Sequence, residues 1–265
     1  MKGIINFESI WRRSLKSMGR YYQWLFWQQR NYPTKKMKQM QALYSQFVQP
    51  GNLCFDIGAN MGSRVATFLL LKAKVIALEP QAKCVNELHK VFMGYDVTVI
   101  PKGVGAKNEF KDFFLADDTL ISSFSQEWIS GMKSGHFLKN KWDKTEQIEI
   151  VTLNMLMEEY GVPDFIKIDT EGFELEVMKG LSTPVRALSF EYTLPHQKDQ
   201  AIACVELLDK LYSNKALFNI CRDEAYQMRF DKWMDAGELL AILKSDDFNK
   251  ANYGVYGDIY VTKTL

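Results

Sequence analysis

Two short segments of the chain place carboxylates and glycines directly after apolar runs. In the first, the apolar run 53–57 includes Asp56 and leads into a loop that holds Gly58, Asn60 and Gly62. Glycine adopts backbone angles closed to other residues and lets a ligand approach the main chain, and asparagine tolerates the left-handed conformation. The helix expected next points its free N–H groups at the same loop. This pattern predicts a binding site for a nucleotide-like cofactor.

A further carboxylate, Glu79, closes a second apolar run at residues 74–78. It follows the first segment at about the twenty-residue interval at which a carboxylate meets ribose hydroxyls in doubly wound folds. Asp56 would repel the pyrophosphate of a dinucleotide, whereas S-adenosylmethionine (SAM) carries two cationic groups and no phosphate. The pair therefore favours SAM. A cap on the loop's own N–H groups is the structural alternative for Asp56.

The second segment, residues 164–172, is an apolar strand that contains Lys167 and ends in Asp169 and Glu171. Ligands of open α/β sheets bind outside the carboxyl ends of the strands, so these groups should share a crevice with the first segment. Burying either charge without a partner is costly, which disfavours a pure packing role. The structural alternative is a Lys167–Asp169 ion pair, with Glu171 capping the following helix.

Another carboxylate, Glu191, ends the apolar run 185–190, and His196 follows shortly after. Carboxylates and imidazoles can remove a proton from an acceptor group in general-base catalysis. The candidate catalytic residues are Asp169, Glu171, Glu191 and His196, with Asp169 first because its strand end should face the methyl group. Asp169 with Glu171 or Glu191 also forms an oxygen-only set suited to Mg²⁺, an alternative that we do not favour. A hydrogen-bonded strand end is the structural alternative for Glu191.

The elements that position these residues alternate between strands and helices from residue 52 onward, which predicts an α/β fold with a largely parallel sheet. Strands are expected near 52–57, 74–79, 96–101, 110–115, 147–152, 163–168, 185–191, 216–221 and 255–261. The segment 117–145 interrupts this rhythm, and a loop of that length is often functional. We expect it to form an irregular substrate loop within a cofactor-binding domain that spans residues 41–265.

The first forty residues, 1–40, form a separate basic, aromatic-rich extension in which apolar residues recur at helical spacing. The favoured interpretation is a helix that packs on the domain as a lid or a dimer element. The alternative is an interfacial helix on an anionic membrane, with Trp24 and Trp27 at the headgroup level. A second helix is expected over 35–48, between the breaks at Pro33 and Pro50.

The composition indicates a globular protein, since 47% of the 265 residues are hydrophobic and 25% are charged. The net charge of +1 gives no overall attraction toward nucleic acid, so no nucleic-acid partner is expected. The four cysteines lack metal-ligand spacing and are expected to be reduced core residues. With no apparent signal peptide and no run of membrane-spanning length, we expect a cytoplasmic location, with peripheral membrane contact through the extension as the alternative.

Together these motifs resemble the FkbM family of SAM-dependent methyltransferases. The resemblance covers roughly residues 40–200 and rests on FDIGANMG at 55–62, LEP at 78–80, SS at 122–123, VTL at 151–153, IKIDTEGFE at 166–174 and VMKG at 177–180. It implies a class I, Rossmann-like fold with a mostly parallel seven-stranded sheet and helices on both faces. Asn154 and Met155 depart from the family, which usually has acidic residues there, and the N-terminal extension lies outside the match.

The resemblance also implies roles for particular residues. Asp56, Gly58, Asn60 and Gly62 would hold the methionine part of SAM, Glu79 would hold the ribose, and Ser123 would be a further cofactor contact. The turn from Asp169 to Gly172 would border the site of methyl transfer. The expected activity is O-methylation of a hydroxyl on a carbohydrate, a glycolipid or a related small metabolite.

Two other classes of function stay open from the sequence. An NAD-dependent oxidoreductase would share the fold and Glu79. A non-catalytic binding protein would work through its basic N-terminal helix and keep the cofactor domain only as a scaffold.

Overall fold

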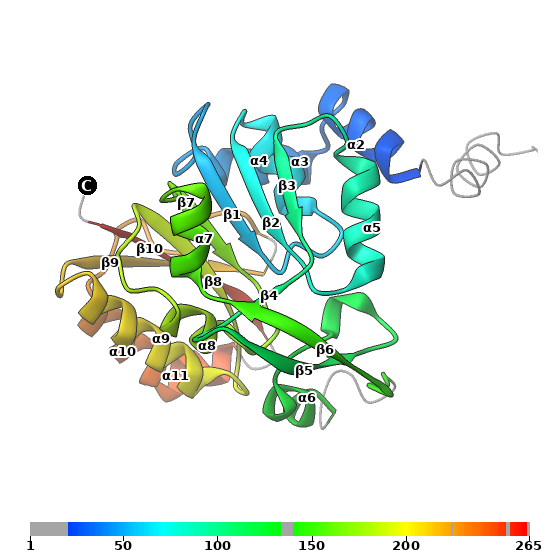
Figure 1. Cartoon of the computed structure of the whole chain (residues 1–265). Helices are drawn as coiled ribbons and strands as arrows, with labels where there is room; N and C mark the ends of the chain where they lie inside the picture. Colours follow the sequence, from blue (N-terminus) through cyan, green and yellow to red (C-terminus); the bar gives the residue numbers. More distant parts are fainter. Residues whose placement is uncertain (1–20, 134–139, 224, 253–254, 264–265) are drawn as a thin grey trace, which may run out of the picture.

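A central sheet of seven strands organises the computed structural model, which describes residues 21–133, 140–223, 225–252 and 255–263 (Figure 1). The strand order is β3-β2-β1-β7-β8-β10-β9, with β10 antiparallel to both of its neighbours and the other pairs parallel. The strands are β1 Leu53–Ile57, β2 Lys74–Leu78, β3 Val97–Ile100, β7 Phe165–Ile168, β8 Ala187–Thr193, β9 Ala216–Arg222 and β10 Tyr256–Lys263. The expected α/β fold with a mostly parallel seven-stranded sheet is confirmed.

The strands are apolar on both faces because helices cover both faces of the sheet. Alternate residues of one strand enter opposite cores: Cys54 packs with the helices α2 to α5, and Phe55 packs with α7 to α11. All four cysteines are buried and unpaired, as expected. The helices are α2 Tyr21–Asn31, α3 Lys35–Tyr44, α4 Ser63–Leu70, α5 Ala82–Val91, α6 Gln126–Lys133, α7 Leu153–Tyr160, α8 Glu174–Lys179, α9 Lys198–Leu211, α10 Ala236–Lys244 and α11 Asp246–Ala251.

A second, three-stranded sheet has the order β4-β6-β5 and lies beside α6 (Figure 1). It consists of β4 Gly103–Val104, β5 Glu109–Leu115 and β6 Lys144–Val151. Two of the strands expected from the sequence therefore belong to this smaller sheet and not to the central one.

The segment 117–145 is not irregular throughout, because α6 lies within it. This helix is short, contains Gly131 and buries only Trp128, Ile129 and Met132 among its side chains. A periodic apolar stripe of two turns is too brief to stand out in the sequence.

The N-terminal extension packs on the domain over the part that the structure describes. The Phe26 ring of α2 meets Phe92 and Tyr95 edge-on, with ring centroids 5.1 Å apart in each pair. Gln23 donates a hydrogen bond to the Lys90 carbonyl at the end of α5. The packing interpretation is thus confirmed for α2, whereas residues 1–20 of the extension lie outside the described residues.

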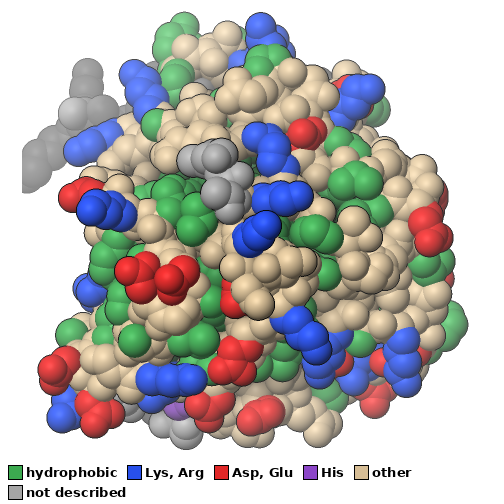
Figure 2. Space-filling view, turned by 90° about the vertical axis from the view of Figure 1, so that its left-hand side faces the viewer, with side chains coloured by type: hydrophobic (Ala, Val, Ile, Leu, Met, Phe, Trp, Pro, Cys, Tyr) green, Lys and Arg blue, Asp and Glu red, His purple; other side chains and the backbone are tan. Residues whose placement is uncertain are grey.

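The surface carries charges of both signs. On the face drawn in Figure 2, Lys and Arg side chains lie interspersed with Asp and Glu side chains, in keeping with the net charge of +1. Within the described ranges, none of the helices has the length and apolar character needed to cross a membrane.

Candidate active site

The loop between β1 and α4 has the unusual backbone that its sequence predicts. Gly58 has φ 83° and Asn60 has φ 45°, both in the left-handed region. A Cβ atom on Gly58 would lie 1.8 Å from the Asp169 carbonyl oxygen. Glycine is therefore required at residue 58 because the loops after β1 and β7 touch there.

Gly62 serves helix packing. It is the N-cap of α4, with φ 83°, and a Cβ atom there would lie 2.5 Å from the Phe92 ring and 2.7 Å from Leu88. This glycine lets the start of α4 approach α5 closely.

Glu79 ties the loop after β1 to the end of β2. One carboxylate oxygen accepts a hydrogen bond from the Asn60 N–H at 2.8 Å, and the other accepts one from the Gln81 N–H at 2.8 Å. Burial raises the pKa of Glu79 to about 7, against the lowering effect of these N–H donors. Each oxygen has a further lone pair, which can accept a hydrogen bond from a ribose hydroxyl.

Asp56 lies within β1 and is almost fully buried, with 1% of its surface exposed. Its Oδ2 atom has no hydrogen-bond partner among the described residues. Burial raises the pKa of Asp56 to about 7, while the nearby charges of Arg64 and Lys167 lower it. A buried carboxylate oxygen without a partner fits the ammonium group of a ligand.

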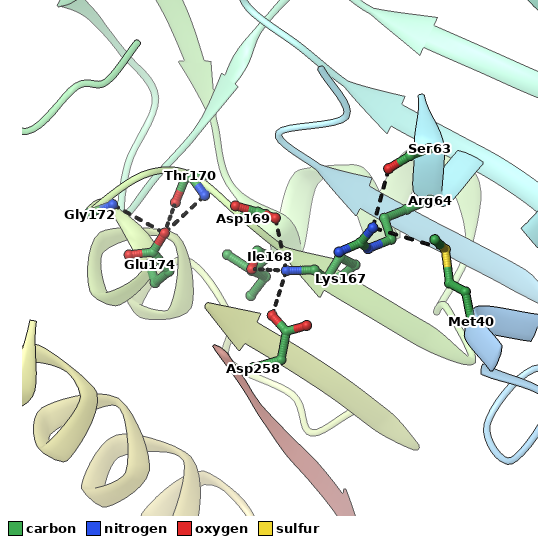
Figure 3. A network of polar contacts seen from close by, with 10 residues as sticks. All are labelled: Met40, Ser63, Arg64, Lys167, Ile168, Asp169, Thr170, Gly172, Glu174 and Asp258. Carbon is green, nitrogen blue, oxygen red and sulfur yellow. Dashed lines mark hydrogen bonds and ion pairs between the residues drawn. The ribbon is translucent and has the colours of Figure 1, made fainter. Parts of the chain in front are cut away.

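Lys167 is a fully buried cation at the end of β7 (Figure 3). Its Nζ atom lies 2.8 Å from Asp258 of β10 and 3.2 Å from Asp169. Burial by itself raises the pKa of Asp169, but the charges of Lys167 and Arg64 outweigh it and hold the pKa below its usual range. The Lys167–Asp169 ion pair of the structural alternative is present, and Asp258 is a third member that the sequence did not reveal.

The turn after β7 is held by Glu174, as Figure 3 shows. Its carboxylate accepts hydrogen bonds from the N–H groups of Thr170 at 2.9 Å and Gly172 at 3.3 Å, and from the Thr170 hydroxyl at 3.0 Å. The N-cap of α8 is Phe173 and no side chain among the described residues caps this helix, so the alternative in which Glu171 caps it is wrong. The Glu171 side chain lines the cavity instead.

Three carboxylates meet at the ends of β7 and β8. Asp169, Glu171 and Glu191 each offer one oxygen, and these oxygens all lie within 4.8 Å of one another. Burial, together with the negative charge of Asp169, raises the pKa of both glutamates well above the usual range. Carboxylates this close disfavour one another's ionisation, and the positive charge of Lys167 favours Asp169 as the ionised member. The same oxygens are ligands of the kind that Mg²⁺ takes.

The backbone at Glu171 is itself unusual. This residue has φ 52° and is followed by Gly172 with φ 92°. The left-handed conformation is costly for a residue with a side chain, and such strain concentrates at functional sites. It turns the chain so that Glu171 lies beside Asp169.

These groups line one cavity of about 510 Å³ at the carboxyl ends of the parallel strands. Eight of the candidate residues are in its lining: Asp56, Gly58, Asn60, Glu79, Asp169, Glu171, Glu191 and His196. His196 is exposed and packs against α6, where a Cβ atom on Gly131 would lie 3.3 Å from its Nδ1 atom.

Gly62 and Ser123 are not in that lining. The Ser123 hydroxyl donates a hydrogen bond to the Glu171 carbonyl at 2.6 Å and accepts one from the Ser125 N–H at 2.9 Å. Ser123 thus anchors the segment before α6 to the strained turn. Its neighbour Ser122, whose hydroxyl donates to the Gln81 side chain at 3.2 Å, does line the cavity.

The segment 117–145 reaches the cavity through residues 119–122, Phe124, Trp128 and Met132. The Thr119 carbonyl accepts hydrogen bonds from the side-chain amides of Asn60 and Gln81, both at 3.0 Å. This contact joins the segment directly to the loop after β1.

The sequence analysis missed four charged residues in the lining, Arg64, Lys102, Asp223 and Asp258, of which Arg64 and Asp258 bear on the chemistry. Arg64 lies just beyond the glycine loop, where a helical register would have placed it in the first turn. Asp258 lies on the last strand, far from either motif, and only the sheet order brings it to Lys167.

Comparison with known proteins identifies the family. The model of the Methyltransferase FkbM domain matches residues 56–250, most of the chain. The chain belongs to this methyltransferase family. Membership implies SAM as the methyl donor and favours the methyltransferase interpretation over the NAD-dependent oxidoreductase.

A similar curated protein is the hexuronic acid methyltransferase AglP of Haloferax volcanii, 25% identical over 177 residues, which are 66% of this chain and 69% of that protein. Among solved structures, the precorrin-6y C5,15-methyltransferase of Geobacter metallireducens is 10% identical with a TM-score of 0.45, covering 84% of this chain and 88% of that one. A putative rRNA methylase of Clostridium thermocellum is 13% identical with a TM-score of 0.43, covering 88% and 97%.

Proposed function

We propose that this FkbM-family enzyme transfers the methyl group of SAM to a hydroxyl oxygen of a carbohydrate. The observation that carries the proposal is the group of Asp169, Glu171 and Glu191, within 4.8 Å of one another in the cavity that also contains the glycine loop. An aliphatic hydroxyl becomes a good nucleophile only when its proton is removed. The carboxylate cluster therefore favours a hydroxyl as the methyl acceptor, because a hydroxyl needs a group that takes its proton.

The residues present suit the cofactor. Asp56, Gly58 and Asn60 would hold the methionine part, and Glu79 would accept the ribose hydroxyls. When bound, SAM supplies an electrophilic methyl group on a sulfonium, and that sulfur leaves with the bonding electron pair. The Oδ2 atom of Asp56, which has no partner among the described residues, would accept a hydrogen bond from the ammonium group. SAM carries no phosphate, so the acidic lining of the cavity does not repel it.

In this mechanism Asp169 is the proton acceptor. Lys167 lies 3.2 Å from Asp169 and holds its pKa below the usual range, whereas burial and the charge of Asp169 raise the pKa of Glu171 and of Glu191. As the acceptor oxygen bonds to the methyl carbon, its proton passes to Asp169. Lys167 and Asp258 fix the carboxylate, and the cavity walls align the acceptor and exclude water.

The carbohydrate class is proposed from two observations. The similar protein AglP is a hexuronic acid methyltransferase. In this chain Phe124 and Trp128 line the cavity beside the carboxylates, and an aromatic face suits the apolar face of a sugar ring. A hexuronic acid carries both hydroxyl groups and a carboxylate, so the acceptor atom has to be tested directly.

The test is transfer of labelled methyl from SAM to a panel that pairs a neutral hexose glycoside with the matching hexuronide. Methylation of a hydroxyl gives an ether that survives mild alkali, whereas methylation of the carboxylate gives an ester that releases labelled methanol. We expect alkali-stable label on the sugar. Alkali-labile label confined to the hexuronide, or no transfer to any glycoside, would overturn the proposal.

A parallel reaction with EDTA tests the role of metal. The charges of Lys167 and Arg64 already favour the ionised form of Asp169, so the proposed mechanism uses no Mg²⁺. We expect the rate to be unchanged by EDTA. Loss of turnover that added Mg²⁺ restores would reassign Asp169, Glu171 and Glu191 as metal ligands.

A further inference from the structure

Arg64 is a cation in the lining of the cavity. It lies in the first turn of α4, and its Nη1 atom is 3.2 Å from the Ser63 hydroxyl and 4.0 Å from the Met40 sulfur (Figure 3). Its Nε atom is buried and has no hydrogen-bond partner among the described residues. Within the part of the chain that the structure describes, no carboxylate lies within the 4.0 Å of an ion pair with Arg64.

The carboxylate of Asp56 is in the complementary position. It lines the same cavity, its Oδ2 atom is buried, and that atom also has no partner among the described residues. The two groups carry opposite charges, yet they do not form an ion pair with each other. The Arg64 guanidinium also lies over the Tyr226 ring, 5.6 Å from its centroid, which leaves the Nε atom without a hydrogen-bond partner among the described residues. An unsatisfied buried polar atom is costly, so the Nε atom of Arg64 and the Oδ2 atom of Asp56 are each suited to a polar group that enters the cavity.

A ligand that satisfies both groups carries an ammonium and a carboxylate on the same carbon atom. The amino-acid end of SAM has this chemistry. The start of α4 supports the same assignment, because the N–H groups of a first helical turn lack intrahelical partners and favour a negative charge. A carboxylate beside Arg64 would thus meet two sources of positive potential.

We infer that Arg64 binds the α-carboxylate of the cofactor while Asp56 binds its ammonium group. This inference rests on the proposed SAM site and adds to it the residue that recognises the carboxylate. Arg64 then has two roles: it binds the cofactor, and its charge helps to keep Asp169 ionised.

The test is calorimetric titration of the full-length protein with S-adenosylhomocysteine (SAH) and with decarboxylated SAH, which keeps the amine and lacks the carboxylate. The wild-type protein should bind decarboxylated SAH about 10- to 100-fold more weakly than SAH, the range of a charge-assisted hydrogen-bonded pair. In titrations at a pH well above the pKa of Asp56, where loss of Arg64 does not change the ionisation of that carboxylate, Arg64→Met should weaken SAH binding by a similar factor and leave the affinity for decarboxylated SAH within about twofold. Arg64→Lys should recover part of the loss, and Arg30→Met on the exposed face of α2 is the matched control.

The possible failures are distinguishable. If the wild-type protein binds no SAH, the SAM site itself is wrong. If it binds SAH and decarboxylated SAH equally well, the carboxylate is not recognised, and this result stands even if Arg64→Met does not fold. Equal losses for both ligands in Arg64→Met would show a structural role and overturn the inference. An unchanged SAH affinity with a raised KM for a hexuronide would assign Arg64 to the acceptor instead.

Discussion

At the scale of single residues, the carboxylate of Asp56 should make cofactor binding sensitive to pH. Burial raises the pKa of Asp56 to about 7, with Arg64 and Lys167 lowering it and Asp169 raising it. The ammonium group of SAH pairs with the ionised form, so affinity rises as pH increases through this pKa. We expect SAH to bind about tenfold more weakly at pH 6 than at pH 8 in calorimetric titrations.

Two variants check the assignment of this pH dependence. Asp56→Asn should flatten the profile, because the titrating group is gone. Glu79→Gln should keep it, because the ribose that Glu79 would bind is neutral. A profile that persists unchanged in Asp56→Asn would contradict the role given to Asp56.

Lys167 should be essential for stability. It is fully buried between Asp169 and Asp258, and its removal leaves two carboxylates without their cation. Lys167→Met should lower the free energy of unfolding by about 3 to 5 kcal/mol, as measured by urea denaturation. Lys90→Met, which removes an exposed cation paired with Glu87, is the control and should cost less than about 1 kcal/mol. Equal effects of the two substitutions would show that the buried network carries no special stability.

The sequence revealed some of these residues and not others for a physical reason. Asp56, Glu79 and Asp169 each follow or end an apolar run, and parallel strands deliver such residues to one edge of a sheet. Asp258 could not be found in this way, because β10 runs antiparallel and meets Lys167 only through the sheet order. The placement of Glu171 in the cavity depends on the left-handed turn at this residue, which sequence patterns do not specify.

At the scale of elements, the contact between the loops after β1 and β7 depends on Gly58. A Cβ atom there would meet the Asp169 carbonyl oxygen at 1.8 Å, in a backbone conformation with φ 83°. Gly58→Ala should therefore lower the free energy of unfolding by more than about 3 kcal/mol in urea denaturation, through strain and displacement of the two loops.

Gly94→Ala is a matched control for this substitution. Gly94 has φ 84° and is exposed, and a Cβ atom there would have nothing within 4 Å. Gly94→Ala should lower the free energy of unfolding only by the cost of the left-handed conformation, about 1 to 2 kcal/mol. Equal losses at the two glycines would contradict a specific loop contact at Gly58.

The strands were predictable because their apolar runs are continuous and bounded by loops. The division of the strands between two sheets was not predictable. The strands β5 and β6 show the same local pattern as the central strands, yet they pair with each other over seven residues. The helix α6 was also missed. Its burial depends on the cluster formed by Ile121, Trp128, Ile129 and Met132, which unites residues from both sides of the turn at Ser122.

At the scale of the whole molecule, the cavity joins both halves of the central sheet. Its lining includes residues at the ends of β1 and β2 on one side and of β7, β8 and β10 on the other. A ligand that bridges them should stabilise the entire fold. SAH at 100 times its Kd should add about 2.7 kcal/mol and raise the Tm by roughly 5 to 10 °C in a thermal scan.

The same scan with NAD⁺ is the control. We expect no change in Tm, because the carboxylate of Asp56 faces the place that a pyrophosphate would occupy. A shift with NAD⁺ and none with SAH would restore the oxidoreductase interpretation that the family assignment disfavours.

The most direct test of the account is the turnover number of Asp169→Asn at saturating SAM, with a glycoside that the wild-type enzyme methylates. Asparagine keeps the shape of the side chain but cannot take the proton of the acceptor hydroxyl. We predict that kcat falls by about 10²- to 10⁴-fold, the usual contribution of a general base. A variant that turns over at close to the wild-type rate would contradict the claim that Asp169, held by Lys167 at the end of β7, accepts that proton.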